Sequence, residues 1–279
     1  KQHKIAIIEM GANHQKEINF LCNIAQPTYG VITNIGSAHL EGFGSLQGVI
    51  DTKKELYEFI KHNKGHLFVN DEDELLLSIS NGISKITYGK SGDTTGHITE
   101  TTPLLSIKYN NKIIKSHLIG DFQFSNILLA ICIGNYFNIS TQNIKRSIEN
   151  YIPTNNRSQL VKTKKNTLIL DAYNANPSSM KAMLNSFANQ QYKDKLCILG
   201  DMLELGEESN KEHLEIITLT NELELDCIFV GEIFHSLTKN SFKNKQELVK
   251  HIQGNNIHKR TILLKGSRGI GLEQLIKNL

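Results

Sequence analysis

The chain has 279 residues, 39% of them hydrophobic and 21% charged, a composition typical of a folded globular protein with two domains. The formal net charge is only +3 and the lysines form no basic stripe, which argues against nucleic-acid binding. No membrane span or signal peptide is recognisable, and four well-separated cysteines in apolar contexts are predicted to be reduced core thiols of a cytoplasmic protein.

The first half of the chain repeats one pattern, in which a short apolar strand ends in a polar loop and a helix follows. Residues 5–8 predict a strand leading into the loop 9–14, and residues 31–33 predict a strand leading into a glycine-rich loop that carries His39. Apolar residues at 49, 50, 56, 57 and 60 then predict an amphipathic helix with Lys53 on its apolar stripe.

The middle of the chain departs from this rhythm. Alternating residues between 83 and 120 predict a β-rich segment, with a hairpin turn at residues 110–111. Helices are predicted at residues 125–136 and 141–151, and the polar segment 153–156, which contains a proline, is the predicted linker.

The second half returns to strands followed by polar loops. Buried strands are predicted at residues 167–170, 196–199 and 261–264, and Asn176-Pro177 predicts a helix start with asparagine as the N-cap. Strands that alternate with helices predict an α/β fold with parallel sheets. We therefore expect two α/β domains, residues 1–153 and 154–279.

Ligands of parallel sheets bind beyond the carboxyl ends of the strands, and the first half places Glu9 and His39 there. Lys53 on an apolar stripe is costly unless its charge is paired, removed or chemically converted, although its stem could pack while the ammonium reaches water. A neutral lysine can add carbon dioxide to form a carbamate, and Glu9, His39 and carbamylated Lys53 would then make a magnesium shell. Taken singly, Glu9 fits a cap or salt-bridge partner and His39 a packed loop imidazole.

The second half has its own candidates. Asp171 and Asn174 fit turn and cap chemistry. Asp201 and Glu204 fit ordinary loop carboxylates. The segment Lys265-Gly-Ser-Arg268 follows a strand and is predicted to start a helix, where two cations and a hydroxyl would clamp a carboxylate or phosphate. The alternative for this segment is a solvated basic turn.

Several strings, in order along essentially the whole chain, resemble the Mur ligases. They are Glu9-Met-Gly-Ala-Asn-His, Thr33-Asn-Ile-Gly-Ser-Ala-His-Leu-Glu-Gly-Phe-Gly-Ser, Thr52-Lys-Lys-Glu-Leu, Asp171-Ala-Tyr-Asn-Ala-Asn-Pro, Leu199-Gly-Asp-Met-Leu-Glu-Leu-Gly and Lys265-Gly-Ser-Arg-Gly. The resemblance implies a central ATP-binding domain followed by a Rossmann-like C-terminal domain. It also implies ATP- and Mg²⁺-dependent amide-bond formation in peptidoglycan precursor synthesis.

By the same resemblance, Glu9 and His39 would bind Mg²⁺ beside a carbamylated Lys53, with Lys53 and His39 serving catalysis. Four residues would lie at the ATP: Asn126, Arg157, Asp171 and Asn174. Three would lie near the acceptor dipeptide: Lys265, Ser267 and Arg268. The strings favour the branch whose substrates are UDP-N-acetylmuramoyl-tripeptide and D-alanyl-D-alanine, acting as a monomer.

Two parts of the family pattern are missing. The glycine-rich phosphate loop is absent, since the closest string, Ser84-Lys-Ile-Thr-Tyr-Gly-Lys-Ser91, lacks its first glycine and lies among strand-like residues. The domain that would hold the uridine nucleotide is also absent. We therefore expect the rear part of the central domain plus a complete C-terminal domain, inactive by itself. Two alternatives remain: another Mur or folylpolyglutamate-type amino-acid ligase, and a non-catalytic binding module.

Overall fold

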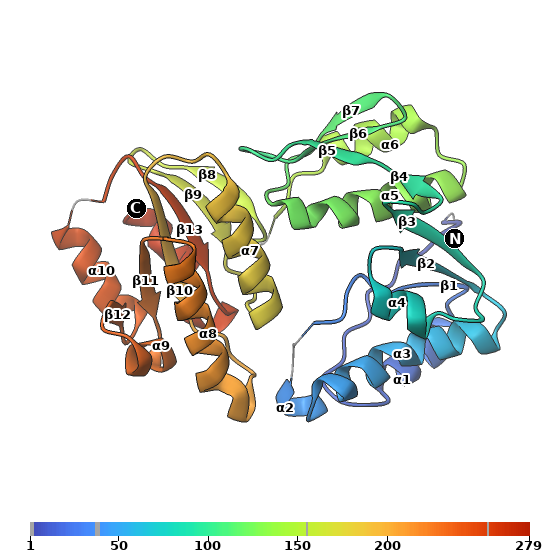
Figure 1. The fold of residues 1–279 in the computed structure, drawn as a ribbon, viewed down its shortest axis with the longest axis horizontal. Helices are drawn as coiled ribbons and strands as arrows, with labels where there is room; N and C mark the ends of the chain where they lie inside the picture. Colours follow the sequence, from blue (N-terminus) through green and yellow to red (C-terminus); the bar gives the residue numbers. More distant parts are fainter. Residues whose placement is uncertain (1–2, 37–39, 155, 256) are drawn as a thin grey trace. The chain divides into compact units, whose positions relative to one another are not determined.

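The structure is a computed structural model that describes residues 3–36, 40–154, 156–255 and 257–279, without the side chains of residues 40 and 41. Its contacts divide the chain into two compact units (Figure 1). Unit 1 comprises Lys1–Thr95 and Leu128–Asn138, and unit 2 comprises Gly96–Ile127 and Ile139–Leu279. The predicted domain boundary at residues 153/154 stays a prediction.

Unit 1 is built on a parallel sheet with the strand order β1-β2-β3-β4. The strands are β1 (Tyr29–Val31), β2 (His66–Asn70), β3 (Lys85–Gly89) and β4 (Thr94–Thr95), and the helices are α1 (Glu17–Ala25), α2 (Leu40–Phe43), α3 (Leu46–His62), α4 (Glu74–Ile79) and most of α5 (Phe124–Tyr136). Because side chains alternate along a strand, Leu67 of β2 packs into a core with Tyr57 of α3, whereas Phe68 contacts the ring of Tyr136 on α5, 5.5 Å away.

The strand predicted at residues 5–8 was wrong. These residues have no regular secondary structure, and the Ile7 side chain is 90% exposed. A run of β-branched residues forms a strand only where a neighbouring strand pairs with it, and within the described residues β1 pairs with β2 alone. The first strand of the β-rich segment predicted between residues 83 and 120 is β3, and it belongs to the parallel sheet of unit 1.

Unit 2 contains a six-stranded sheet with the order β12-β11-β10-β13-β9-β8. The strands are β8 (Gln159–Lys162), β9 (Thr167–Asp171), β10 (Lys195–Gly200), β11 (Cys227–Val230), β12 (Ser241–Phe242) and β13 (Thr261–Lys265), and all pairs are parallel except β8 with β9. The predicted α/β fold with parallel sheets is confirmed.

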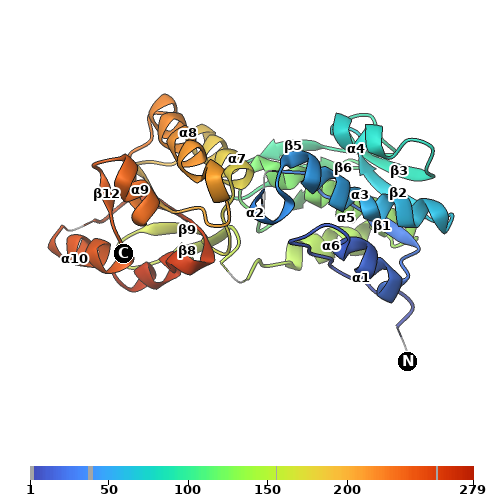
Figure 2. The ribbon, with the colours of Figure 1, turned by 90° about the horizontal axis from the view of Figure 1, so that it is seen from below.

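Helices cover both faces of this sheet (Figures 1 and 2). One face packs against α7 (Pro177–Asn189), α8 (Ser209–Glu222) and α9 (Glu232–Leu237), and the other against α10 (Lys245–Gly254) and the 3₁₀ segment η4 (Leu272–Lys277). Ile169 lies in the first of these cores and its neighbours Leu168 and Leu170 in the second. Strands buried on both faces explain the continuous apolar runs in the sequence.

A second sheet of unit 2 is antiparallel and small. It consists of β5 (His97–Glu100), β6 (Ser106–Tyr109) and β7 (Lys112–Lys115), and is followed by the 3₁₀ turn η1 (Asp121–Gln123) and by α6 (Thr141–Asn150). The hairpin predicted at residues 110–111 is confirmed, because Asn110 and Asn111 have φ values of 45° and 58°, as a two-residue type I′ turn requires.

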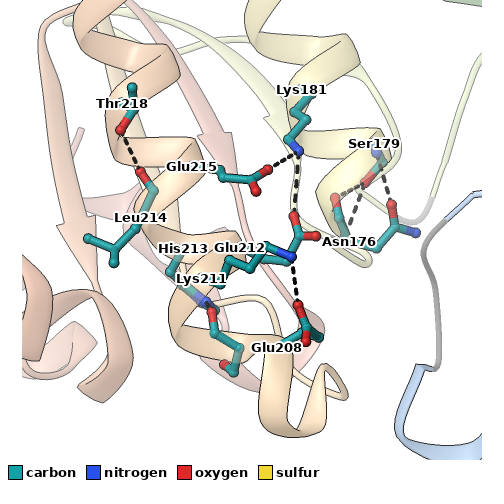
Figure 3. Close-up of polar contacts among 11 residues, drawn as sticks. Asn176, Ser179, Lys181, Glu208, Lys211, Glu212, His213, Leu214, Glu215 and Thr218 are labelled. Atoms are coloured by element: carbon teal, nitrogen blue, oxygen red, sulfur yellow. Dashed lines mark hydrogen bonds and ion pairs between the residues drawn. The ribbon is translucent and has the colours of Figure 1, made fainter. Parts of the chain in front are cut away.

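The start of α7 and its contact with α8 show how local sequence sets this layer (Figure 3). Asn176 caps α7 as predicted, since its Oδ1 accepts from the Ser179 amide at 2.9 Å and the Ser179 hydroxyl accepts from the Asn176 amide at 3.2 Å. Lys181 of α7 then lies between Glu212 and Glu215 of α8, at 3.5 and 2.6 Å. These ion pairs align the two helices on the surface of unit 2.

Candidate functional site

The carboxyl edge of the six-stranded sheet brings together residues from distant parts of unit 2. Asp171 ends β9 and Lys265 ends β13, and the two residues are paired in register. The Lys265 Nζ donates to Asp171 Oδ2 at 2.6 Å, and the Lys265 side chain is only 2% exposed. Asp171 Oδ1 accepts from the amide and hydroxyl of Ser158, at 3.0 and 3.3 Å. Lys265 is therefore committed to orienting the Asp171 carboxylate.

Two arginines at this edge gather around one aromatic ring. The guanidinium carbon of Arg157 lies 4.1 Å from the centroid of the Tyr173 ring, and that of Arg268 lies 5.6 Å from it. Both arginines are exposed and the ring is half-buried. Sequence reasoning missed Tyr173, although an aromatic residue among polar residues directly after a buried strand is a usable signal.

Ser267 joins loops, and its position corrects one prediction. Its hydroxyl is buried, accepts from the Leu203 amide at 2.9 Å and donates to the Ala175 carbonyl at 3.4 Å. Arg268 begins the three-residue 3₁₀ turn η3 (Arg268–Ile270), which η4 follows, so the helix predicted after Lys265-Gly-Ser-Arg268 is two short 3₁₀ segments and not an α-helix. Of the two cations in that segment, Arg268 alone has its side chain exposed. Asn174 is exposed, and its Oδ1 accepts from the Ala175 amide at 2.8 Å.

Asp201, predicted as an ordinary loop carboxylate, is buried and structural. It accepts hydrogen bonds from the amides of Ile233 and Phe234, at 3.0 and 2.9 Å, and so holds the first turn of α9. Beside it, His213 Nε2 accepts from the Met202 amide at 3.0 Å, while Nδ1 donates to the Ser209 carbonyl in the tautomer that this arrangement requires. Burial lowers the pKa of His213 and favours the neutral ring.

In unit 1 the loop after residue 9 meets the short helix α2, which precedes α3. A Cβ added to Gly42 would lie 2.1 Å from the Asn13 carbonyl oxygen, so the two backbones touch. The Glu17 carboxylate accepts from the amides of Asn13 and His14, at 2.7 and 3.1 Å. Glu55 of α3 accepts hydrogen bonds from the amide of Lys16, at the end of this loop, and from the amide of Asn19 in α1, at 2.7 and 2.8 Å. Two carboxylates thus fix the loop next to α3.

The predicted magnesium ligands are only partly placed. The Lys53 ammonium donates to the Asn34 carbonyl at 2.9 Å, and burial lowers the pKa of Lys53. Glu9 is exposed, and His39 lies outside the described residues. Within the described ranges, no cluster of three or more His, Cys, Asp or Glu side chains could hold a metal ion. In its ammonium form Lys53 is a donor and no ligand, so the magnesium shell stays a prediction.

The last predicted ATP contact is Asn126 on α5. Its side chain is exposed, and its amide group donates to Gln123 Oε1 at 2.8 Å. The role of Asn126 likewise stays a prediction. The four cysteines are all unpaired and buried, as predicted. No helix in the described part of the chain is long and apolar enough to cross a membrane.

Comparison with known families assigns both halves of the chain. The family model described as the Mur ligase middle domain matches residues 1–134, and the one described as the Mur ligase, glutamate ligase domain matches residues 156–268. The parallel sheets and the loops at their carboxyl edges agree with this match. The chain belongs to the Mur ligase family.

Individual relatives belong to one branch of that family. UDP-N-acetylmuramoyl-tripeptide–D-alanyl-D-alanine ligase of Haemophilus influenzae is 32% identical over 100% of this chain and 65% of its own length. A crystal structure of MurF from Acinetobacter baumannii aligns with a TM-score of 0.86 and 28% identity, covering 100% of this chain and 65% of that one. MurF ligase from Thermotoga maritima in complex with ADP shares the fold, with a TM-score of 0.80 at 21% identity over 96% of this chain and 65% of that one. The chain thus spans about two thirds of the length of the relatives it matches.

Proposed function

We propose that this chain is the ATP-using and acceptor-binding part of a ligase that joins D-alanyl-D-alanine to UDP-N-acetylmuramoyl-tripeptide. The observation that carries the proposal is the carboxyl edge of the unit 2 sheet, where Arg157, Arg268 and the Lys265–Asp171 pair converge. The names of the relatives support the substrates, and the ADP-bound structure of one relative supports ATP. We also propose, as the family resemblance implies, that the protein acts as a monomer in the cytoplasm.

In the proposed reaction, a carboxylate oxygen of the tripeptide attacks the γ-phosphorus of ATP, and ADP leaves. The amine of D-alanyl-D-alanine then attacks the acyl carbon, and inorganic phosphate leaves as the amide forms. Phosphoryl transfer of this kind depends on positioning and on neutralised charge more than on covalent help from the protein. Arg157 supplies such charge, and Asp171, oriented by Lys265, supplies an acceptor for a hydroxyl of the nucleotide. The family resemblance places Arg268 near the acceptor dipeptide, but it lies over the same Tyr173 ring as Arg157, so we propose that it also faces the phosphates.

In unit 1, Glu9, His39 and Lys53 are proposed to hold Mg²⁺, with Lys53 carbamylated. Magnesium would neutralise part of the phosphate charge and so reduce the repulsion between the phosphates and the attacking carboxylate. The lowered pKa of Lys53 supports this proposal, because only a neutral amine adds carbon dioxide. The exposed Asn126 is proposed to contact the nucleotide, with Asn174 near it.

The test is a ligation assay with mass-spectrometric detection of the product. The chain alone is expected to release no phosphate from ATP with tripeptide and D-alanyl-D-alanine. A chimera that carries the upstream third of the Haemophilus influenzae relative, joined before Lys1, is expected to form the pentapeptide product. Single amino acids and D-glutamate serve as competing acceptors. A chimera that prefers a single amino acid contradicts the proposed substrate, and one that binds nucleotide without turnover favours a binding module.

A further inference from the structure

Three separate segments of unit 2 place Tyr173, Arg157 and Arg268 together. Arg157 precedes β8, Tyr173 follows β9, and Arg268 follows β13, so all three lie at the same edge of the sheet. Both guanidinium carbons lie over the Tyr173 ring, at 4.1 and 5.6 Å from its centroid. Both distances are within the range of about 6 Å in which a cation is attracted by an aromatic face.

This arrangement places two like charges beside one half-buried aromatic ring. Their repulsion opposes it, and the ring offsets only part of that repulsion. The carboxylate of Asp171 is already engaged by Lys265 and by Ser158. An anion with several oxygens is therefore the partner that the pair of guanidinium groups suits, because each group presents a planar fork of donors.

The backbone on which these side chains stand is well anchored. Ser158, next to Arg157, donates its amide to Asp171 at 3.0 Å. Ser267, next to Arg268, donates its amide to the Asp201 carbonyl at 3.1 Å. The remaining freedom is rotation of two long side chains, each of which loses rotamer entropy when it binds a ligand. Contact with one ring removes part of that freedom before the ligand arrives.

We infer that Tyr173 is a positioning residue that holds Arg157 and Arg268 as one binding cluster for the phosphate oxygens of a nucleotide. The inference rests on the proposed function, since ATP is its ligand, and deepens it by giving a role to Tyr173, for which the sequence predicted none. The aromatic face carries the effect, and the Tyr173 hydroxyl is dispensable. Tyr173 acts through the arginines and takes no part in the bond changes.

The experiment measures binding of inorganic pyrophosphate to the 279-residue chain by calorimetry at low, fixed ionic strength. Tyr173→Leu is expected to weaken binding about fivefold, from the loss of two weak cation–aromatic contacts. Tyr173→Phe keeps the ring and is expected to stay within about twofold of the parent chain. Tyr151→Leu is the matched control, because Tyr151 is an exposed tyrosine of the same unit, and is expected to bind like the parent.

A second readout does not depend on ligand binding. The Nε–Hε resonances of Arg157 and Arg268, assigned through Arg157→Lys and Arg268→Lys, are expected to show ring-current shifts in the parent and in Tyr173→Phe. Those shifts should vanish in Tyr173→Leu, and circular dichroism checks that this variant is folded. If Tyr173→Leu does not fold, the parent and Tyr173→Phe still test the inference. Absence of ring-current shifts on the two arginines in either protein, or a clear loss of pyrophosphate affinity in Tyr173→Phe, contradicts it.

The outcomes separate this inference from the proposed function. Equal affinities of Tyr173→Leu and the parent, equal losses in Tyr173→Leu and Tyr173→Phe, or no saturable pyrophosphate binding by the parent each overturn the inference. None of these results bears on whether the chimera ligates. If the chimera has no ligase activity but pyrophosphate binding depends on the aromatic ring at residue 173, the proposed function is overturned. The inference about Tyr173 and the two arginines then still holds.

Discussion

Replacing Lys265 by methionine should destabilise unit 2 far more than the loss of an ordinary lysine. The side chain of Lys265 is 2% exposed and that of its partner Asp171 is 16% exposed, with 2.6 Å between Nζ and Oδ2. Methionine fills the stem volume but leaves the Asp171 carboxylate with only Ser158 as a donor. Removing one partner of a buried ion pair costs about 3–5 kcal/mol, and the partial exposure of Asp171 favours the lower end, about 3 kcal/mol.

Amide hydrogen exchange of β9 and β13 measures this loss of stability in unit 2, independently of the stability of unit 1. A loss of about 3 kcal/mol corresponds to exchange roughly 150-fold faster at protected amides. The matched control is Lys181→Met, whose side chain is 38% exposed and pairs with Glu215 on the surface (Figure 3). That surface pair should be worth at most about 1 kcal/mol, or about fivefold in exchange.

A second variant identifies the source of the cost. Asp171→Asn removes the charge and keeps an oxygen for the Ser158 amide, so adding it to Lys265→Met should recover about 1–2 kcal/mol. Equal costs for Lys265→Met and Lys181→Met would refute the reasoning about burial. A double variant as unstable as Lys265→Met would show that the unpaired carboxylate is not what destabilises the protein.

Three further predictions concern other contacts. Burial lowers the pKa of His213 below its ordinary 6.5, so the unfolded chain takes up a proton first. Unit 2 should therefore lose stability as the pH falls below about 6.5, and urea titrations should show this slope in the parent and not in His213→Gln. Asp201→Asn weakens the hold on the first amides of α9 and should cost about 1–2 kcal/mol, seen as faster exchange of those amides; unchanged rates would contradict it. Gly42→Ala forces a Cβ against the Asn13 carbonyl and should cost about 1–3 kcal/mol in thermal unfolding, whereas Gly11→Ala meets open space and should change little; equal effects would exclude the close approach.

Local rules sufficed where the determining contacts are local. Asn176 and Pro177 start α7 through contacts within three residues, and Asn110 and Asn111 make the hairpin by their own backbone preferences. Strand runs buried on both faces were recognisable because nothing polar interrupts them. Residues 5–8 have the same composition, yet the outcome there depends on a pairing partner that the run itself does not encode.

The site could be predicted as a set of positions but not as a set of roles. Lys265 and Ser267 are typical ligand-binding residues by type and place. The register of β9 with β13 turns Lys265 toward Asp171, 94 residues earlier in the chain, and buries Ser267 among loops. Tyr173 acquires its neighbours from two other segments, one before β8 and one after β13. Such register and loop contacts are non-local, so no residue pattern in one segment reveals them.

The place of β13 in the sheet has a consequence for the synthesis of the protein. β13 lies between β10 and β9, although it comes last in sequence among the strands of the described residues. Until the ribosome has released residues 261–265, β9 and β10 lack their common neighbour. Their facing edges then have unpaired backbone groups, and apolar side chains on both faces of the sheet are less well covered. Non-local pairing of this kind folds slowly and leaves nascent chains prone to aggregation. Unit 2 should therefore depend on chaperones, or on slow dilute refolding, until β13 pairs with both of its neighbours.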